Sequence, residues 1–284
     1  MVDGKYIFKT SLIDCHVHSK SSHDSWAEPS DIVRETLKNG FLGAIITDHV
    51  DIADEGTDCL FPAYDSYRNY CSDVKKAIEA EGAYDGFILN IGAEIGESIR
   101  NQKACEKLIK ELPLDSVMGS VHKIYIDGRD FVFSDYKFPE LPEDFVRRVV
   151  VQYYKDVLET AKTSDIDILC HMNLINRYEL KFFKQDIFDD ELGEIIREIL
   201  AVIIRRNIAL EINGSRYSYG AYMPGPELLK IYKSMGGKLI TYGSDAHTAE
   251  TVGQGFDGAR KMLLELGFDK LYYYSGRKSV AYDI

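Results

Sequence analysis

Histidine is scarce in this sequence, with seven residues among 284, and some common features are missing altogether. No run of 18 or more apolar residues occurs, and the first ten residues lack the apolar centre of a signal peptide. We therefore expect a cytoplasmic protein without a membrane partner. Lys and Arg (34) are outnumbered by Asp and Glu (46), which gives a net charge of −12. This balance argues against binding to nucleic acid, which favours a basic face, and leaves small molecules as expected partners.

Cysteine provides no framework either. The five cysteines are odd in number and scattered without CxxC spacing, so neither a disulfide scaffold nor a zinc ribbon is expected. The chain also has no internal repeat, low-complexity tract or linker rich in Pro and Gly. Because 284 residues with 45% hydrophobic content can bury a sizeable core, a single domain over residues 1–284 is the simplest organisation.

What the chain does contain is an alternation of short apolar runs with longer helical patterns. Strands are predicted at 12–18, 43–49, 87–94, 115–122, 166–171, 208–214 and 238–247. Helical patterns span 29–40, with Ser30 as the N-cap and Gly40 as the stop, and 190–207, whereas 126–144 is a long excursion. The alternation predicts an α/β fold with a parallel sheet, and it fits both a doubly wound sheet and a closed barrel.

The scarce histidines are concentrated at the ends of the predicted strands, where all except His23 are found. In chain order the strand ends carry His16 and His18, Asp48 and His49, Glu94, His122, His171, and Asp245 and His247. In an α/β barrel the carboxyl ends of the strands meet on one face, so these residues would lie together. A single histidine at a strand end is usually a hydrogen-bonded core residue, but metal-capable residues at six of seven ends predict a metal site.

The spacing and number of these residues indicate a chemistry. His16 and His18 are two residues apart, which turns both imidazoles to one side of an extended strand, and Asp245 and His247 share this spacing. The donors exceed what one ion needs, so two or three divalent ions are expected, and imidazole with carboxylate suits Zn, Mn or Fe. Such ions would hold a phosphate dianion and lower the pKa of a bound water. The residues therefore predict metal-assisted hydrolysis of an anionic ester.

Seven motifs, in order along the chain, resemble those of the PHP (polymerase and histidinol phosphatase) family of phosphoesterases. They are DCHVH (14–18), ITDH (46–49), GAE (92–94), GSVH (119–122), CHMNLINRY (170–178), LEING (210–214) and GSDAH (243–247). The segment 236–268, followed by GRKSV, is similar to the histidinol-phosphate phosphatase branch. The resemblance implies a distorted, TIM-like (β/α)7 barrel with a trinuclear metal centre at the carboxyl ends of its strands.

The resemblance also implies which residues hold each ion. His16, His18, Glu94 and Asp245 match the ligands of the first ion. Glu94 would bridge to a second ion that is held by His122 and His171. The third ion would take His49, His247 and a residue six positions after His18, which is Asp24, although His23 lies immediately before it. We favour Asp24, and His23 is then a surface or supporting residue. Asp48 is expected to orient a ligand rather than bind metal.

Two arginines match residues that this branch uses near the phosphate, Arg177 and Arg216. A guanidinium can bond two phosphate oxygens at once, although a loop salt bridge is the plainer explanation. Asn173 departs from an aspartate that is common in the branch. The expected activity is hydrolysis of L-histidinol phosphate in histidine biosynthesis, with Asp245 and His247 as candidates to relay a proton to the leaving alkoxide. Alternatives are action on a nucleotide or sugar phosphate, and a non-catalytic metal-binding regulatory role.

Overall fold

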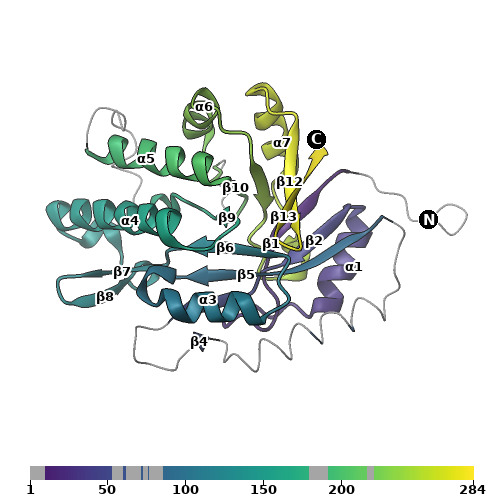
Figure 1. The fold of residues 1–284 in the computed structure, drawn as a ribbon, viewed down its shortest axis with the longest axis horizontal. Helices are drawn as coiled ribbons and strands as arrows, with labels where there is room; N and C mark the ends of the chain where they lie inside the picture. Colours follow the sequence, from purple (N-terminus) through teal and green to yellow (C-terminus); the bar gives the residue numbers. More distant parts are fainter. Residues whose placement is uncertain are drawn as a thin grey trace, which may run out of the picture.

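The computed structural model describes residues 10–52, 60–61, 72, 76, 86–178, 191–215 and 221–284. Its main sheet contains a path of seven parallel strands in the order β1-β2-β5-β6-β9-β10-β11. The two ends of this path meet, because Val17 forms a parallel bridge with Ala246 and the N–H of His18 donates to the carbonyl of Ala246 at 2.8 Å. The sheet therefore curls into a nearly closed barrel, which confirms the predicted fold class (Figure 1).

The seven barrel strands follow the predicted ranges closely. They are Ile13–Val17 (β1), Gly43–Ile46 (β2), Ile88–Gly96 (β5), Ser116–Ser120 (β6), Ile168–Leu169 (β9), Ala209–Asn213 (β10) and Ile240–Gly243 (β11). All except β5 end before the predicted strand does, so most of the predicted strand-end residues lie in the loops just beyond. The prediction of one strand over 43–49 is wrong, because His49 begins a separate strand, β3 (His49–Ile52), which pairs in parallel with β5.

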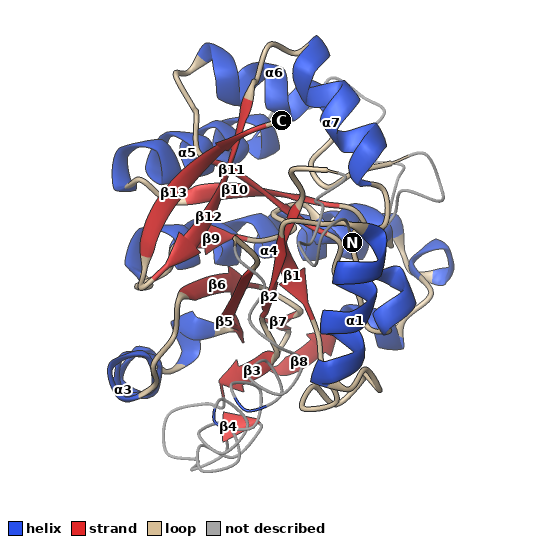
Figure 2. Ribbon diagram, turned by 90° about the vertical axis from the view of Figure 1, so that its right-hand side faces the viewer, coloured by secondary structure: helices blue, strands red, loops and turns tan. Residues whose placement is uncertain are grey.

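Helices surround the strands on the outside (Figure 2). They are α1 (Pro29–Asn39), α3 (Gln102–Glu111), α4 (Glu143–Thr163), α5 (Glu191–Arg206), α6 (Pro226–Ser234) and α7 (Phe256–Glu265). The predicted N-cap Ser30 is wrong by two positions: Glu28 caps α1, because Pro29 presets a helical φ at the first helical residue. Gly40 does end the helix, at a left-handed φ of 75°. Within the described residues, no helix is both long and apolar enough to span a bilayer.

Three hairpins or strand pairs extend the barrel, and periodicity predicted none of them. β3 pairs with β4 (Leu60–Phe61), and the excursion after β6 forms the hairpin β7 (Lys123–Ile126) and β8 (Arg129–Val132). A C-terminal hairpin, β12 (Lys270–Ser275) and β13 (Lys278–Asp283), packs beside β11.

The C-terminal hairpin is fixed to the amino ends of the barrel strands by polar contacts. The guanidinium of Arg277 in its turn donates to Asp167, which precedes β9. The Tyr282 hydroxyl lies 3.3 Å from the carbonyl oxygen of Ile13 in β1, to which it donates. The hairpin therefore covers the end of the barrel opposite to the carboxyl ends of the strands.

Candidate metal centre

The predicted donors converge at the carboxyl ends of the strands. The Nε2 atoms of His16 and His18 lie 3.0 Å apart, and Glu94 Oε2 lies 3.3 Å from His16 Nε2. Asp245 Oδ1 is 3.3 Å from His18 Nε2. His16, His18 and Glu94 are fully buried. The first ligand set that the resemblance implied is thus assembled around one point, which is reached from β1, β5 and the loop after β11.

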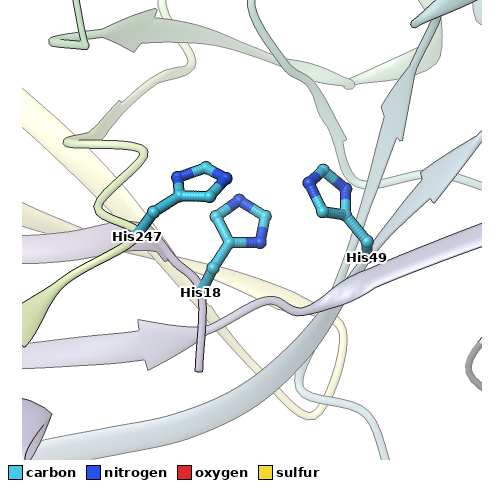
Figure 3. Close-up of side chains that lie close together, drawn as sticks. All are labelled: His18, His49 and His247. Carbon is cyan, nitrogen blue, oxygen red and sulfur yellow. The ribbon is translucent and has the colours of Figure 1, made fainter. Parts of the chain in front are cut away.

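The second and third sets adjoin this point. Glu94 turns its other oxygen, Oε1, toward His171 Nε2 at 2.7 Å and His122 Nε2 at 3.1 Å. The rings of His49 and His247 each lie 4.3 Å from the ring of His18, centroid to centroid (Figure 3), and His49 Nδ1 lies 3.0 Å from Glu94 Oε2. Glu94 therefore lies between two sets of histidines, in a position to bridge them.

Asp24 and His23 occupy different places beside the third set. Asp24 Oδ2 lies 3.1 Å from His247 Nε2 and 3.6 Å from His49 Nε2. His23 is exposed, and its ring centroid lies 5.3 Å from that of His49. The placement favours Asp24 over His23 as the third carboxylate or imidazole donor of this set.

The arrangement of the first set fits a bound cation. His16 Nδ1 lies 2.6 Å from a carboxylate oxygen of Glu211, which can only accept, so Nδ1 carries the proton. His18 Nδ1 lies 3.1 Å from Ser22 Oγ, whose own proton goes to Asp48 Oδ1 at 2.6 Å, so His18 Nδ1 donates as well. In the neutral imidazoles both Nε2 lone pairs then face each other at 3.0 Å. A divalent cation facing both lone pairs and the adjacent carboxylates removes this repulsion.

Charges in the cluster support the same conclusion. Burial and the neighbouring His49 lower the pKa of His18 to about 3, which keeps its imidazole neutral and able to ligate. Burial acts to raise the pKa of Glu94, but attraction to His49 and His122 outweighs it and holds that pKa well below its ordinary value. Burial acts to lower the pKa of His49, but attraction to Glu94 outweighs it and raises that pKa to about 10. The carboxylates are therefore ionised and balanced by positive charge, and carboxylate with imidazole is the donor set of Zn, Mn and Fe.

Backbone strain is concentrated around this centre. Among the described residues other than glycine, six have a positive φ, and three of these lie at the site: Glu97 (φ 50°), His171 (φ 25°) and Asp245 (φ 56°). Such conformations cost about 1–3 kcal/mol each and persist where surrounding contacts enforce them. At Asp245 the enforcing contact is its N–H, which donates to the carbonyl of His16 at 2.9 Å.

Several supporting residues were not found from the sequence. Ser22 connects His18 to Asp48: its Oγ lies 3.1 Å from His18 Nδ1 and donates to Asp48 Oδ1, which fits the supporting role expected of Asp48. Asp51 Oδ1 lies 3.8 Å from His122 Nδ1. Glu211 contacts His16, as described above. In the sequence these residues stand out only as a carboxylate or hydroxyl inside or beside an otherwise apolar strand. A single sequence does not show which ring nitrogen of a histidine such a group faces.

A cavity of about 330 Å³ opens over the donors and is lined on its other sides by residues of the β7–β8 excursion and the loop after β9. Arg177 enters it, with Nη2 2.6 Å from Ser215 Oγ and 3.4 Å from Asp245 Oδ2. This places a guanidinium beside the first ligand set. The second predicted arginine, Arg216, lies outside the described residues.

The fold and the donors define a metal-binding α/β barrel with an arginine at its mouth. Residues 14–215 match the PHP domain family, and the chain belongs to that family.

Several proteins similar along nearly the whole chain are described as histidinol-phosphatases. A probable histidinol-phosphatase of Clostridium acetobutylicum is 28% identical over 269 residues, which cover 92% of this chain and 96% of that protein. The histidinol-phosphatase of Lactococcus lactis is 28% identical over 278 residues, covering 94% and 95%. The Lactococcus lactis enzyme's crystal structure, with zinc, L-histidinol and phosphate, aligns with a TM-score of 0.72 at 25% identity over 94% of this chain and 98% of that one. A Listeria monocytogenes structure (TM-score 0.68, 18% identity, coverage 87% and 99%) shares the fold.

Proposed function

We propose that this protein is a metal-dependent phosphomonoesterase that hydrolyses L-histidinol phosphate to L-histidinol and phosphate. The observation that carries the proposal is the set of three adjoining donor groups around Glu94, with Arg177 in the cavity above them. The full-length similarity to histidinol-phosphatases supports the choice of substrate. The proposal includes two or three divalent ions, for which the zinc of the Lactococcus lactis structure is the first candidate.

The residues proposed to hold these ions are His16, His18, Asp24, His49, Glu94, His122, His171, Asp245 and His247. Ions held there would supply positive charge for the phosphate and acidify the attacking water. A phosphate ester is a fitting ligand, because a dianion placed beside this centre meets the guanidinium of Arg177 as well.

The chain's own residues orient the ester and move the proton. Arg177 is held by Ser215 and Asp245, and its fork presents the remaining N–H groups to phosphate oxygens. His247 lies on the loop of Asp245, after β11, with Nδ1 3.0 Å from the carbonyl oxygen of Asp245. Because this contact makes Nδ1 the donor, Nε2 is the atom that faces the cavity. We assign the proton relay to the leaving alkoxide to Asp245 and His247: Asp245 through Oδ2, which is directed at Arg177, and His247 through Nε2 only while that atom is not bound to an ion. Arg177 with Arg216 would hold the phosphate.

The test is phosphate release from L-histidinol phosphate, compared with nucleotide, sugar and aryl phosphates, by purified protein whose metals are assayed by elemental analysis. The proposal requires the highest kcat/KM on histidinol phosphate and loss of turnover on chelation. A preference for another ester would refute the substrate assignment and retain the phosphatase. Bound metal without turnover of any ester would indicate a regulatory metal-binding protein.

A matched pair of variants tests the third donor set. Asp24→Asn removes the carboxylate 3.1 Å from His247 Nε2, and we expect it to bind one ion fewer. His23→Ala changes the adjacent exposed imidazole and keeps the full metal content. The reverse result would assign the ligand to His23.

A further inference from the structure

Glu211 belongs to none of the three donor sets, yet it is completely buried at the centre of the barrel. It lies in β10, which only β11 separates from β1 in the closed barrel, and its carboxylate points toward the donors. Oε1 lies 2.6 Å from His16 Nδ1, and Oε2 accepts the backbone N–H of His171 at 2.7 Å. One carboxylate therefore contacts a histidine of the first set and a histidine of the second.

Each of these contacts fixes a different property of its histidine. The bond from His16 Nδ1–H determines the tautomer, which leaves the lone pair on Nε2 directed at His18 and Glu94. The bond from the His171 N–H holds a residue whose φ is 25°, a strained conformation. That conformation places His171 Nε2 2.7 Å from Glu94 Oε1.

We propose that Glu211 is a positioning residue that sets His16 and His171 for metal binding, and thereby couples the first ligand set to the second. The proposal depends on the metal centre of the proposed function, but not on the identity of the substrate. Glu211 does not act as a ligand in this assignment, because the carboxylate oxygens that face the site are already engaged by N–H donors.

The neighbouring strand, β11, leaves space for this carboxylate. A Cβ on Gly243 in β11 would lie 2.3 Å from Glu211 Oε1 and 2.4 Å from His16 Cβ, so the absence of a side chain there leaves the pair its space. Asn213 Nδ2 lies 3.3 Å from Oε2 and adds a third donor. A carboxylate accepts all three N–H groups, whereas a glutamine would turn its own N–H groups toward one of them.

The experiment compares Glu211→Gln with Asp167→Asn in the full-length protein. Asp167 is also a largely buried carboxylate that accepts a backbone N–H, from Val117 at 2.8 Å, but it lies at the amino ends of the strands. Zinc affinity is measured by competition with a chromophoric chelator, zinc stoichiometry by elemental analysis, and the metal-free melting temperature by circular dichroism.

We expect Glu211→Gln to bind zinc about 10–100-fold more weakly and to reach the wild-type stoichiometry at saturating zinc. Asp167→Asn should melt at a lower temperature and retain wild-type zinc affinity. The proposal is overturned if Glu211→Gln binds zinc with unchanged affinity, or if it holds one ion fewer at saturation, which would make Glu211 a ligand. It is also overturned if only the metal-free melting temperature falls. Because these readouts use zinc alone, failure to hydrolyse histidinol phosphate would refute the proposed function and leave this inference standing.

Discussion

Tyr153 in α4 supports the loop that carries both His171 and Arg177, and its hydroxyl offers a sharp test of that support. The hydroxyl accepts the N–H of Leu174 at 3.0 Å and donates to the carbonyl of His171 at 3.3 Å. The ring is 1% exposed, so solvent does not replace these bonds. Tyr153→Phe removes one oxygen atom and leaves a buried N–H and a buried C=O without this partner.

The N–H of Leu174 and the carbonyl of His171 keep the bond that joins them at 2.8 Å, so the loss is that of the two hydrogen bonds of the hydroxyl, each of which contributes about 0.5–1.5 kcal/mol. We therefore expect Tyr153→Phe to lower the free energy of unfolding by about 2 kcal/mol. The unfolding entropy of a chain of 284 residues is about 0.6 kcal/mol/K, so the melting temperature should fall by about 3 °C. KM for the phosphate ester should rise as well, since Arg177 lies at the end of the same loop.

The matched control is Tyr154→Phe, one residue further along the same helix. Tyr154 is equally buried, but the bond from its hydroxyl goes to a side chain, Asn176 Oδ1, at 3.3 Å. Thermal melts and KM are measured for both variants under the same metal conditions. Equal losses of stability and unchanged KM in the two variants would refute the assignment of a supporting role to Tyr153.

Four further predictions follow from the same contacts. Chelating the metals should lower the melting temperature by about 7 °C, since a ligand at 1,000-fold its Kd adds about 4 kcal/mol, and re-addition should restore it. Arg177→Lys should lower kcat/KM about 10–100-fold and weaken inhibition by inorganic phosphate, because an ammonium cannot bond two oxygens in one plane. Arg277→Ala should cost about 2 kcal/mol in a urea titration, because Asp167 then keeps a largely buried charge without its ion pair. Burial raises the pKa of Asp156 to about 6, so the folded state loses stability as pH rises from about 4 to 6. Asp156→Asn should lack this loss and be about 1 kcal/mol more stable than the wild type at pH 7. The same dependence of the free energy of unfolding on pH in both proteins would refute this prediction.

The sequence was most informative where residues that can bind metal lie at the ends of predicted strands. His16, His18, Glu94 and His122 could be placed together because parallel strands bring their carboxyl ends to one face. The choice of a barrel over an open sheet needed more than periodicity, since both use the same alternation of elements. The closing contact between Val17 and Ala246 is a single bridge, and no local pattern encodes it.

Other parts of the site could not be predicted because they depend on which atoms face each other. His49 was expected at the end of a strand, but the strand is interrupted at residues 47–48, and His49 starts β3 opposite Glu94, in the same register along β5 as β2. Glu211 could not be assigned a role, since that role depends on the direction of two N–H groups from other elements. The hairpin β7–β8 has strands of four residues, too short for a period of two to stand out.

The closure of the barrel has a consequence for how the protein is made. The first and last barrel strands both supply donors, and Asp14 near the start accepts N–H bonds from Ser244 and Gly253, across 230 and 239 positions. A chain emerging from the ribosome therefore carries most of its histidines long before it carries Asp245 and His247. Contacts of such long range form late. Complete metal uptake thus has to wait until Asp245 and His247 have been made, so a full set of ions reports closure of the barrel.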